Sequence, residues 1–231
     1  MTERLTYQES ELLRMTKKSY KAVVFDMDDT LIKTYAIKLR QHQHYAQHVH
    51  GFAIDEDEFL RHWGKPFDVF LAGVYAHIDV APEVVKEQYL QFSHLFPVEL
   101  HDDTVQVLDH LHGLGKKLGI VTATAREVVM RDLTMAGFPF ERLHKLQTSS
   151  DTHVHKPNPK VFEPMLHSLA QEGITDDILY VGDALMDYFA ARDAGLHFIG
   201  VTTGAVSAEQ FREAGVTQTI DRLGVLTDWV A

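Results

Sequence analysis

The acidic residues around Asp26 have the spacing that first points to chemistry. An apolar run over residues 22–25 is followed by Asp26, Asp28 and Asp29. Such a run predicts a buried strand of a parallel sheet. Along a strand, Asp26 and Asp28 would point to one side and Asp29 to the other. Two carboxylates at the end of an apolar strand repel each other and lose hydration, so they require a cation, a shared proton or polar partners.

A second apolar run also ends in acidic residues. Residues 178–181 precede Gly182 and Asp183, and Asp187 follows four positions later on an expected helix. Open α/β sheets bind ligands at the edge where the carboxyl ends of their parallel strands lie. Carboxylate oxygens are the ligands that a hard divalent cation prefers. Taken alone, the first motif would favour a solvated acidic turn after a strand, but the two motifs together predict a Mg²⁺ site.

Four ordered motifs resemble those of the haloacid dehalogenase superfamily of hydrolases. The first has the usual form Asp-x-Asp-Gly-Thr, the second is an apolar strand that ends in Ser or Thr, and the third is a lysine. In this chain they correspond to residues 25–31, residues 120–122, Lys156 and residues 182–187. The resemblance covers nearly the whole chain from Lys21 onward. Asp29, at the position where Gly is commoner, is a departure that touches no catalytic role.

The resemblance implies how the first motif would act. Asp26 would be the nucleophile that forms an aspartyl-phosphate. Asp28 would protonate the leaving alcohol and later activate water. Dehalogenases of the superfamily do not use an acid at the position of Asp28, so phosphate chemistry is favoured. A β-phosphoglucomutase-like phosphomutase stays open as an alternative, as does a non-catalytic binding or regulatory protein on the same fold.

The resemblance also implies the ligands of the metal and the phosphate. Mg²⁺ would lie between the Asp26 carboxylate, the Asp28 carbonyl and Asp183, with Asp187 as a more distant support. Thr122 and the following backbone N–H, that of Ala123, would hold the phosphoryl oxygens. Lys156 would neutralise charge on Asp26 and on the phosphate.

The interval between Asp26 and Thr122 is far longer than one strand-to-strand crossover, which needs roughly 30 residues. It contains four expected helices, over residues 36–50, 55–63, 67–77 and 82–95, and no convincing pair of strands. We therefore predict an all-helical cap over residues 35–100, similar to that of phosphoglycolate phosphatases and β-phosphoglucomutases. Strands and helices then alternate, which predicts an α/β fold: a doubly wound, parallel-sheet, Rossmann-like catalytic core from residues 1–34 and 101–231.

Substrate selection would belong to the cap, because the core motifs provide only phosphate and metal contacts. Arg61 and Lys65 flank Trp63 at the expected end of a cap helix and are the candidate specificity residues. The alternative is a cation that stabilises a helix end beside a buried Trp63. Among 15 histidines, His44 and His48 have a spacing that suits zinc. A third ligand is not evident, so a surface or core-edge pair is favoured over a zinc site.

The composition limits the partners. The chain has 231 residues, a net charge of −11 and no cysteine. The negative charge argues against nucleic-acid binding, and the sequence has no apolar segment that would span a membrane. Residues 1–20 are polar, with a weak helical stretch over residues 9–15. We predict a cytoplasmic monomer or homodimer whose partner is a small phosphorylated metabolite.

Overall fold

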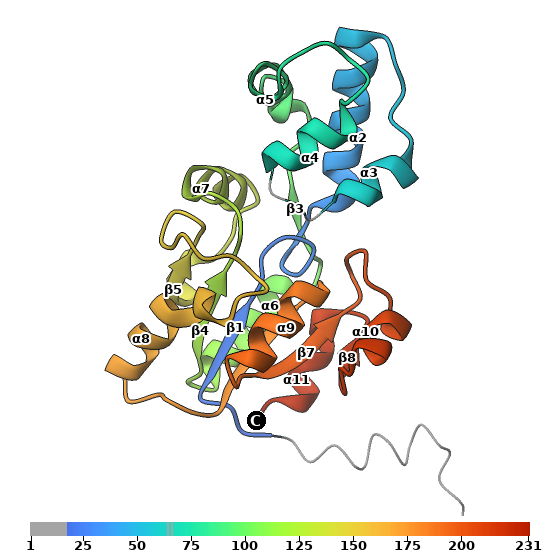
Figure 1. Cartoon of the computed structure of the whole chain (residues 1–231). Helices are drawn as coiled ribbons and strands as arrows, with labels where there is room; N and C mark the ends of the chain where they lie inside the picture. Colours follow the sequence, from blue (N-terminus) through green and yellow to red (C-terminus); the bar gives the residue numbers. More distant parts are fainter. Residues whose placement is uncertain (1–17, 64, 66) are drawn as a thin grey trace, which may run out of the picture.

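The computed structural model describes residues 18–63, 65 and 67–231. The helical stretch expected over residues 9–15 lies outside these residues. Figure 1 shows a sheet covered by helices at the bottom of the view and a cluster of helices at the top. In the described part of the chain, no helix is long and apolar enough to cross a bilayer.

Within the described residues the larger sheet has six strands, and every neighbouring pair is parallel. Their order across the sheet is β5-β4-β1-β6-β7-β8. The strands are β1 (Ala22–Phe25), β4 (Lys117–Val121), β5 (Leu143–Gln147), β6 (Ile178–Gly182), β7 (His197–Val201) and β8 (Thr219–Ile220). The fold class predicted from the sequence is confirmed.

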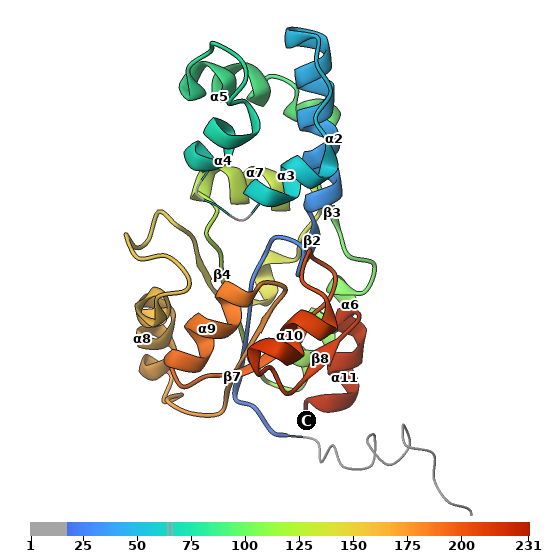
Figure 2. The ribbon, with the colours of Figure 1, turned by 45° about the vertical axis from the view of Figure 1, so that its right-hand side comes forward.

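Helices cover both faces of this sheet (Figures 1 and 2). One face packs on α6 (Thr104–Gly113), α7 (Arg126–Met135) and α11 (Leu226–Trp229). The other face packs on η4 (Pro159–Phe162), α8 (Glu163–Gln171) and α9 (Leu185–Asp193). Three further helical segments belong to this part of the described chain: η3 (Phe140–Arg142), α10 (Ala208–Ala214) and η5 (Leu223–Val225).

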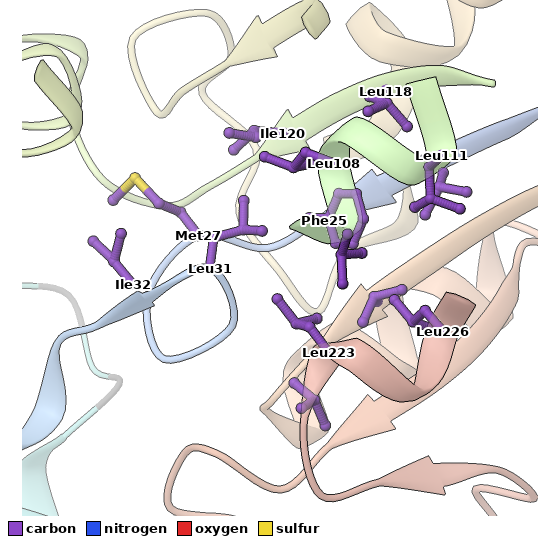
Figure 3. Packing of buried hydrophobic residues seen from close by; sticks show 14 of the residues in the cluster. Phe25, Met27, Leu31, Ile32, Leu108, Leu111, Leu118, Ile120, Leu223 and Leu226 are labelled. Atoms are coloured by element: carbon purple, nitrogen blue, oxygen red, sulfur yellow. The ribbon is translucent and has the colours of Figure 1, made fainter. Parts of the chain in front are cut away.

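Burial on both faces explains why β1 is apolar throughout. Val23 and Phe25 join the first cluster, whereas Ala22 and Val24 join the second. Because successive side chains of a strand point to opposite faces, a strand between two helical layers needs an apolar residue at every position. Figure 3 shows the first cluster around Phe25, with side chains from the loop after β1, from the start of the segment Ile32–Lys33, from α6 and from the C-terminal segment: Met27, Leu31, Ile32, Leu108, Leu111, Leu223 and Leu226.

The helical cluster between β1 and β4 has its own apolar interior. It comprises α2 (Tyr35–Tyr45), the π-helical segment η1 (Ala46–His50), α3 (Glu56–His62), α4 (Phe67–Val74), α5 (Pro82–Leu90) and η2 (Ser93–Leu95). Aromatic rings dominate its interior, among them Tyr45, Phe59, Phe70, Tyr75 and Tyr89. We call residues 35–100 the cap, as in the sequence prediction, and its boundaries stay predictions.

Local sequence explains where several cap helices begin and end. The Asp55 carboxylate accepts hydrogen bonds from the backbone N–H groups of Asp57 and Glu58, which caps α3. Such a cap contributes about 1 kcal/mol. Pro82 occupies the start of α5, where its missing N–H is not needed. The segment η1 ends at Gly51, whose φ of 74° suits glycine.

A short antiparallel pair joins the two connections between the cap and the core. Strand β2 (Ile32–Lys33) pairs with β3 (Glu99–Leu100), with Ile32 opposite Leu100. The sequence predicts no strand at either position, and β3 lies within the range predicted to be all-helical. Strands of two residues are too short to show a periodic pattern in the sequence. This pair forms because the tertiary structure brings the two connections together.

Candidate active site

The carboxyl edge of the sheet brings the predicted acidic residues to one place. Asp26 follows β1 and Asp183 follows β6, and these two strands are hydrogen-bonded neighbours. The backbone N–H of Asp26 donates to the carbonyl of Val181 over 2.8 Å, which extends the pairing of the strands to the nucleophile candidate. Only 8% of each of the two Asp residues is exposed. The sheet therefore places both carboxylates in one buried site.

Lys156 lies between two of the buried carboxylates. Its Nζ is 2.5 Å from Asp26 Oδ1 and 2.6 Å from Asp187 Oδ1. Burial by itself lowers the pKa of Lys156, but Asp187 and Asp26 outweigh it and raise the pKa above the ordinary value. The ammonium group is therefore charged at neutral pH and partly balances the carboxylates.

Asp187 is buried beside the other acidic residues of the candidate site. It is 2% exposed, although it stands near the start of α9. One carboxylate oxygen accepts from the Ala184 N–H over 3.0 Å, and the other accepts from the Tyr180 hydroxyl over 3.2 Å. Asp187 contacts Lys156 directly, and its role as a more distant support of the metal stays a prediction.

Three carboxylates lie close enough together to hold a metal ion. In residues 18–63, 65 and 67–231, one such group is found, and the ligand atoms of Asp26, Asp183 and Asp187 lie within 4.8 Å of one another. Thr30 Oγ1 donates to Asp183 over 3.2 Å and orients it. Gly204 leaves room for this carboxylate, because a Cβ there would lie 1.9 Å from Asp183 Oδ2.

The electrostatics of the group favour a bound cation. The pKa of Asp26 is raised to about 7. Burial is the largest cause, Lys156 acts in the opposite direction, and Asp187 and Asp28 raise the pKa further. Burial, and then the charge of Asp26, raise the pKa of Asp183 well above its ordinary value. Three carboxylates face one ammonium group, so a divalent cation would compensate the excess negative charge. Oxygen ligands alone suit Mg²⁺ better than softer metals.

Asp28 faces a different set of partners from Asp26. Thr34 Oγ1 donates to its Oδ1 over 2.9 Å, and Thr124 Oγ1 donates to its Oδ2 over 2.8 Å. Burial raises the pKa of Asp28, whereas the bonds from Thr124 and Thr34 lower it. The two hydroxyl groups hold the carboxylate in one orientation, which suits a group that transfers protons.

The predicted phosphate ligands lie after β4, the strand on the other side of β1. Thr122 is buried, its N–H donates to the Gln147 carbonyl over 3.1 Å, and its Oγ1 accepts from the Thr124 N–H over 3.0 Å. Ala123 is exposed. The strand order places these residues and Asp26 at the same edge.

The candidate specificity residues lie on the surface of the cap. The Arg61 guanidinium pairs with the Glu58 carboxylate, and 62% of the Arg61 side chain is exposed. Lys65 Nζ is 3.1 Å from His62 Nδ1. Trp63 packs against Phe59 with ring centroids 5.2 Å apart. This packing agrees with the alternative of an anchoring Trp63, and a substrate-binding role for the two cations stays a prediction.

The histidine pair has the contacts of a packed pair. The rings of His44 and His48 stack with centroids 3.9 Å apart, and His48 Nδ1 lies 2.9 Å from the His44 carbonyl. In the part of the chain that the structure describes, neither belongs to a group of three side chains able to hold a metal.

Sequence reasoning missed the threonines that hold the acids. Thr34 and Thr124 are ordinary residues in the sequence, and Thr30 is the threonine of the first motif, to which the sequence assigns no role; the partners of the three lie up to 153 positions away. One signal was available: a buried carboxylate needs donors, and Thr30 and Thr34 follow the acidic motif closely.

Comparison with known proteins relates the chain to a family of hydrolases. A sequence model of the family described as haloacid dehalogenase-like hydrolase matches residues 23–201. A pyrophosphatase, PpaX, of Bacillus pumilus is 31% identical over 196 residues, which cover 81% of this chain and 85% of that protein. A phosphoglycolate phosphatase of Vibrio cholerae is 28% identical over 228 residues, which cover 92% and 98% of the two chains.

The fold has counterparts among solved structures. The crystal structure of CbbY from Rhodobacter sphaeroides, in complex with phosphate, matches with a TM-score of 0.72 at 20% identity. The match covers 90% of this chain and 96% of that chain. At this identity the likeness concerns the fold alone. The ordered acidic motifs, the buried carboxylate site and the sequence match over residues 23–201 together place the chain in the family of haloacid dehalogenase-like hydrolases.

Proposed function

We propose that this hydrolase is a magnesium-dependent phosphatase that cleaves a small-molecule phosphomonoester through an aspartyl-phosphate intermediate. One observation supports this most strongly: the Asp26 carboxylate lies beside Lys156, Asp183 and Asp187 in a buried site. The nucleophilic carboxylate and the phosphate are both negatively charged and repel each other. The Lys156 ammonium group, and Mg²⁺ when bound, would reduce this repulsion. The relatives named pyrophosphatase and phosphoglycolate phosphatase are compatible with a small phosphorylated substrate.

In the first half of the proposed reaction, a carboxylate oxygen of Asp26 attacks phosphorus. A bond forms between Asp26 and phosphorus while the bond between phosphorus and the leaving oxygen breaks. Asp28, as the acid, gives its proton to that oxygen. Thr122 and the N–H of Ala123 hold the phosphoryl oxygens, and Lys156 compensates the charge.

In the second half, water attacks phosphorus of the aspartyl-phosphate. Asp28 takes the proton of this water, and the bond between phosphorus and Asp26 breaks to release inorganic phosphate. Asp26, Asp183, Asp187 and the carbonyl of Asp28 are the groups that would hold Mg²⁺, which when bound stabilises the negative charge of the transferring phosphoryl group.

The site does not by itself separate a phosphatase from a phosphomutase, because both need the same nucleophile and acid. The β-phosphoglucomutase-like alternative therefore stays open, and a non-catalytic protein on the same fold stays the third hypothesis. Cytoplasmic location, a monomeric or homodimeric state and the absence of a nucleic-acid partner stay predictions from the sequence.

The test is a phosphate-release screen over phosphorylated metabolites with Mg²⁺ present, in which pyrophosphate and phosphoglycolate are included. We expect release from at least one compound by the wild type and none by Asp26→Asn. Products are also analysed for transferred phosphate, which would favour the phosphomutase. If neither release nor transfer occurs with any compound, the protein is better described as a non-catalytic member of its family.

A further inference from the structure

Asp29 replaces the glycine that is common at its position, and one oxygen of its side chain accepts hydrogen bonds inside the fold. The residue has a φ of 53°, in the left-handed region that glycine adopts without strain. It is 4% exposed. Its Oδ1 accepts two backbone hydrogen bonds of 2.8 Å, from the N–H groups of Thr34 and Tyr35. A glycine could provide the same backbone conformation, but it could not accept these bonds.

The two N–H groups belong to the residues where the first cap helix begins. Helix α2 spans Tyr35–Tyr45, and Thr34 precedes it. A carboxylate at this end of a helix satisfies free N–H groups and interacts favourably with the helix dipole. The Asp29 backbone is itself held, because Thr203 Oγ1 donates to its carbonyl over 2.5 Å. Asp29 therefore ties the start of α2 to the loop that carries Asp26 and Asp28.

The same hydrogen bonds lead back to the proposed acid. Thr34, whose N–H is held by Asp29, donates its hydroxyl hydrogen to Asp28 Oδ1 over 2.9 Å. The other oxygen of Asp28 is held from the core, by Thr124 over 2.8 Å. The position of Thr34 thus determines one of the two bonds that orient the Asp28 carboxylate.

We propose that Asp29 is a positioning residue for Asp28: it holds Thr34 at the start of the cap so that the Thr34 hydroxyl orients the acid toward the leaving group. This inference rests on the proposed role of Asp28 as general acid. Its effect is exerted through Thr34, and Asp29 itself does not touch the substrate. It predicts that loss of the Asp29 carboxylate impairs leaving-group protonation more than nucleophilic attack.

The chain offers a matched control for the backbone of Asp29. Asp177 has a φ of 54° and lies before β6, where its carboxylate is 3.3 Å from Lys21 Nζ. Its partner is at the opposite end of β1 from the active site. Asp177→Gly therefore makes the same chemical change at the same backbone conformation without touching Thr34.

The experiment compares turnover of an alkyl phosphate, which has a poor leaving group, with that of p-nitrophenyl phosphate, whose phenolate departs without a proton. We expect Asp29→Gly to lower kcat for the alkyl phosphate at least about tenfold more than for the aryl phosphate, within the hundredfold or greater contribution of a general acid. Asp29→Asn should recover most of this loss, because Asn tolerates the left-handed region and keeps an oxygen acceptor. Thr34→Val should reproduce the pattern of Asp29→Gly.

Amide hydrogen exchange gives a readout that does not depend on activity. In Asp29→Gly the N–H groups of Thr34 and Tyr35 should exchange faster than in the wild type, whereas Asp177→Gly should leave both exchange rates and both activities unchanged. Equal losses on the two substrates in Asp29→Gly, with a selective loss in Asp28→Asn, would overturn the positioning role alone. Equal losses in Asp28→Asn itself would overturn the acid role of Asp28, and the role of Asp29 with it.

Discussion

The carboxyl edge of the sheet and the interior of the cap bury polar groups in opposite ways. At the sheet edge, Asp26, Asp187 and Lys156 are buried in direct charge contact. In the cap, the buried His42 and Gln41 are held among aromatic rings and neutral partners. The His42 ring stacks on Tyr89 with centroids 4.0 Å apart, and its Nδ1 lies 2.8 Å from the Tyr75 hydroxyl.

This difference separates the two tasks of the proposed enzyme. Each buried ion of the core needs its partners, because an unpaired charge in the interior costs several kcal/mol. The charged residues of the site therefore cannot change one at a time without loss of activity or stability. The cap carries its candidate specificity cations, Arg61 and Lys65, on the surface, where they can change without an effect on the interior.

The strongest test of the core is the nucleophile. Asp26→Asn keeps the size of the side chain and removes the attacking charge, so we expect phosphate release to fall at least about a thousandfold. Circular dichroism and thermal unfolding should show that the fold persists. Turnover within about tenfold of the wild type would refute the assignment of Asp26 as nucleophile.

The metal should act on the core and leave the cap unaffected. Mg²⁺ at 100 times its Kd should raise the free energy of unfolding by about 2.7 kcal/mol, measured by thermal unfolding, because it binds the folded chain. Asp183→Asn should abolish this effect. Mg²⁺ requires ionised ligands, and the pKa of Asp26 is raised to about 7. Affinity should therefore fall as the pH falls below about 7.

The control for the metal lies in the cap. His48→Ala should leave stabilisation by Mg²⁺ unchanged, since His44 and His48 lie outside the carboxylate group. The metal site would belong to the cap if Zn²⁺ but not Mg²⁺ stabilised the wild type and if His48→Ala removed the stabilisation by Zn²⁺.

A smaller change is expected where the cap meets the substrate. If Arg61 or Lys65 binds the non-phosphate end of an anionic substrate, Arg61→Met or Lys65→Met should raise KM for that substrate about tenfold, the scale of a hydrogen bond to a charged group. Hydrolysis of p-nitrophenyl phosphate should not change. Lys86→Met, at another surface position of the cap, serves as the control. An unchanged KM in both variants would place specificity elsewhere in the cap.

The smallest expected effect is on stability, and it concerns the cap interior. Burial, and then the charge of Lys38, lower the pKa of His42 well below its ordinary value. The unfolded chain therefore binds a proton at His42 near pH 6.5 while the folded chain does not. As the pH falls below this value, His42 should reduce the free energy of unfolding by about 1.4 kcal/mol per pH unit until the folded chain also binds the proton.

His42→Phe isolates this contribution. Urea unfolding at a series of pH values should show a shallower decrease for the variant than for the wild type below pH 6.5. His101, whose pKa burial also lowers, is present in both proteins, so the difference reports on His42. Parallel curves for the two proteins would mean that His42 is protonated in the folded cap.

The sequence by itself determined the strands that position the site. Apolar runs that end in acids mark β1 and β6, because a strand that is buried on both faces needs apolar side chains at successive positions. The cap helices were also predictable, because Pro82 and Gly51 interrupt the helical segments where the structure has their ends. Local signals were sufficient for these elements, since helix capping and the spacing of apolar residues are set by neighbouring residues.

Only the tertiary structure decided which polar groups hold the acids. Thr124 donates to Asp28 across a separation of 96 positions, and Lys156 contacts Asp26 across 130. The lysine was found through its motif, whereas the threonine has no motif that distinguishes it from a surface residue. Asp187 looked like a surface acid of a helix, and the packing of α9 on the sheet buried it against Lys156. In the sequence, Asp29 is a replacement of glycine without a role. In the structure, its carboxylate accepts hydrogen bonds from the N–H groups of Thr34 and Tyr35 at the start of α2. In each case the partner comes from another element, and its identity depends on how the elements pack, which no local pattern records.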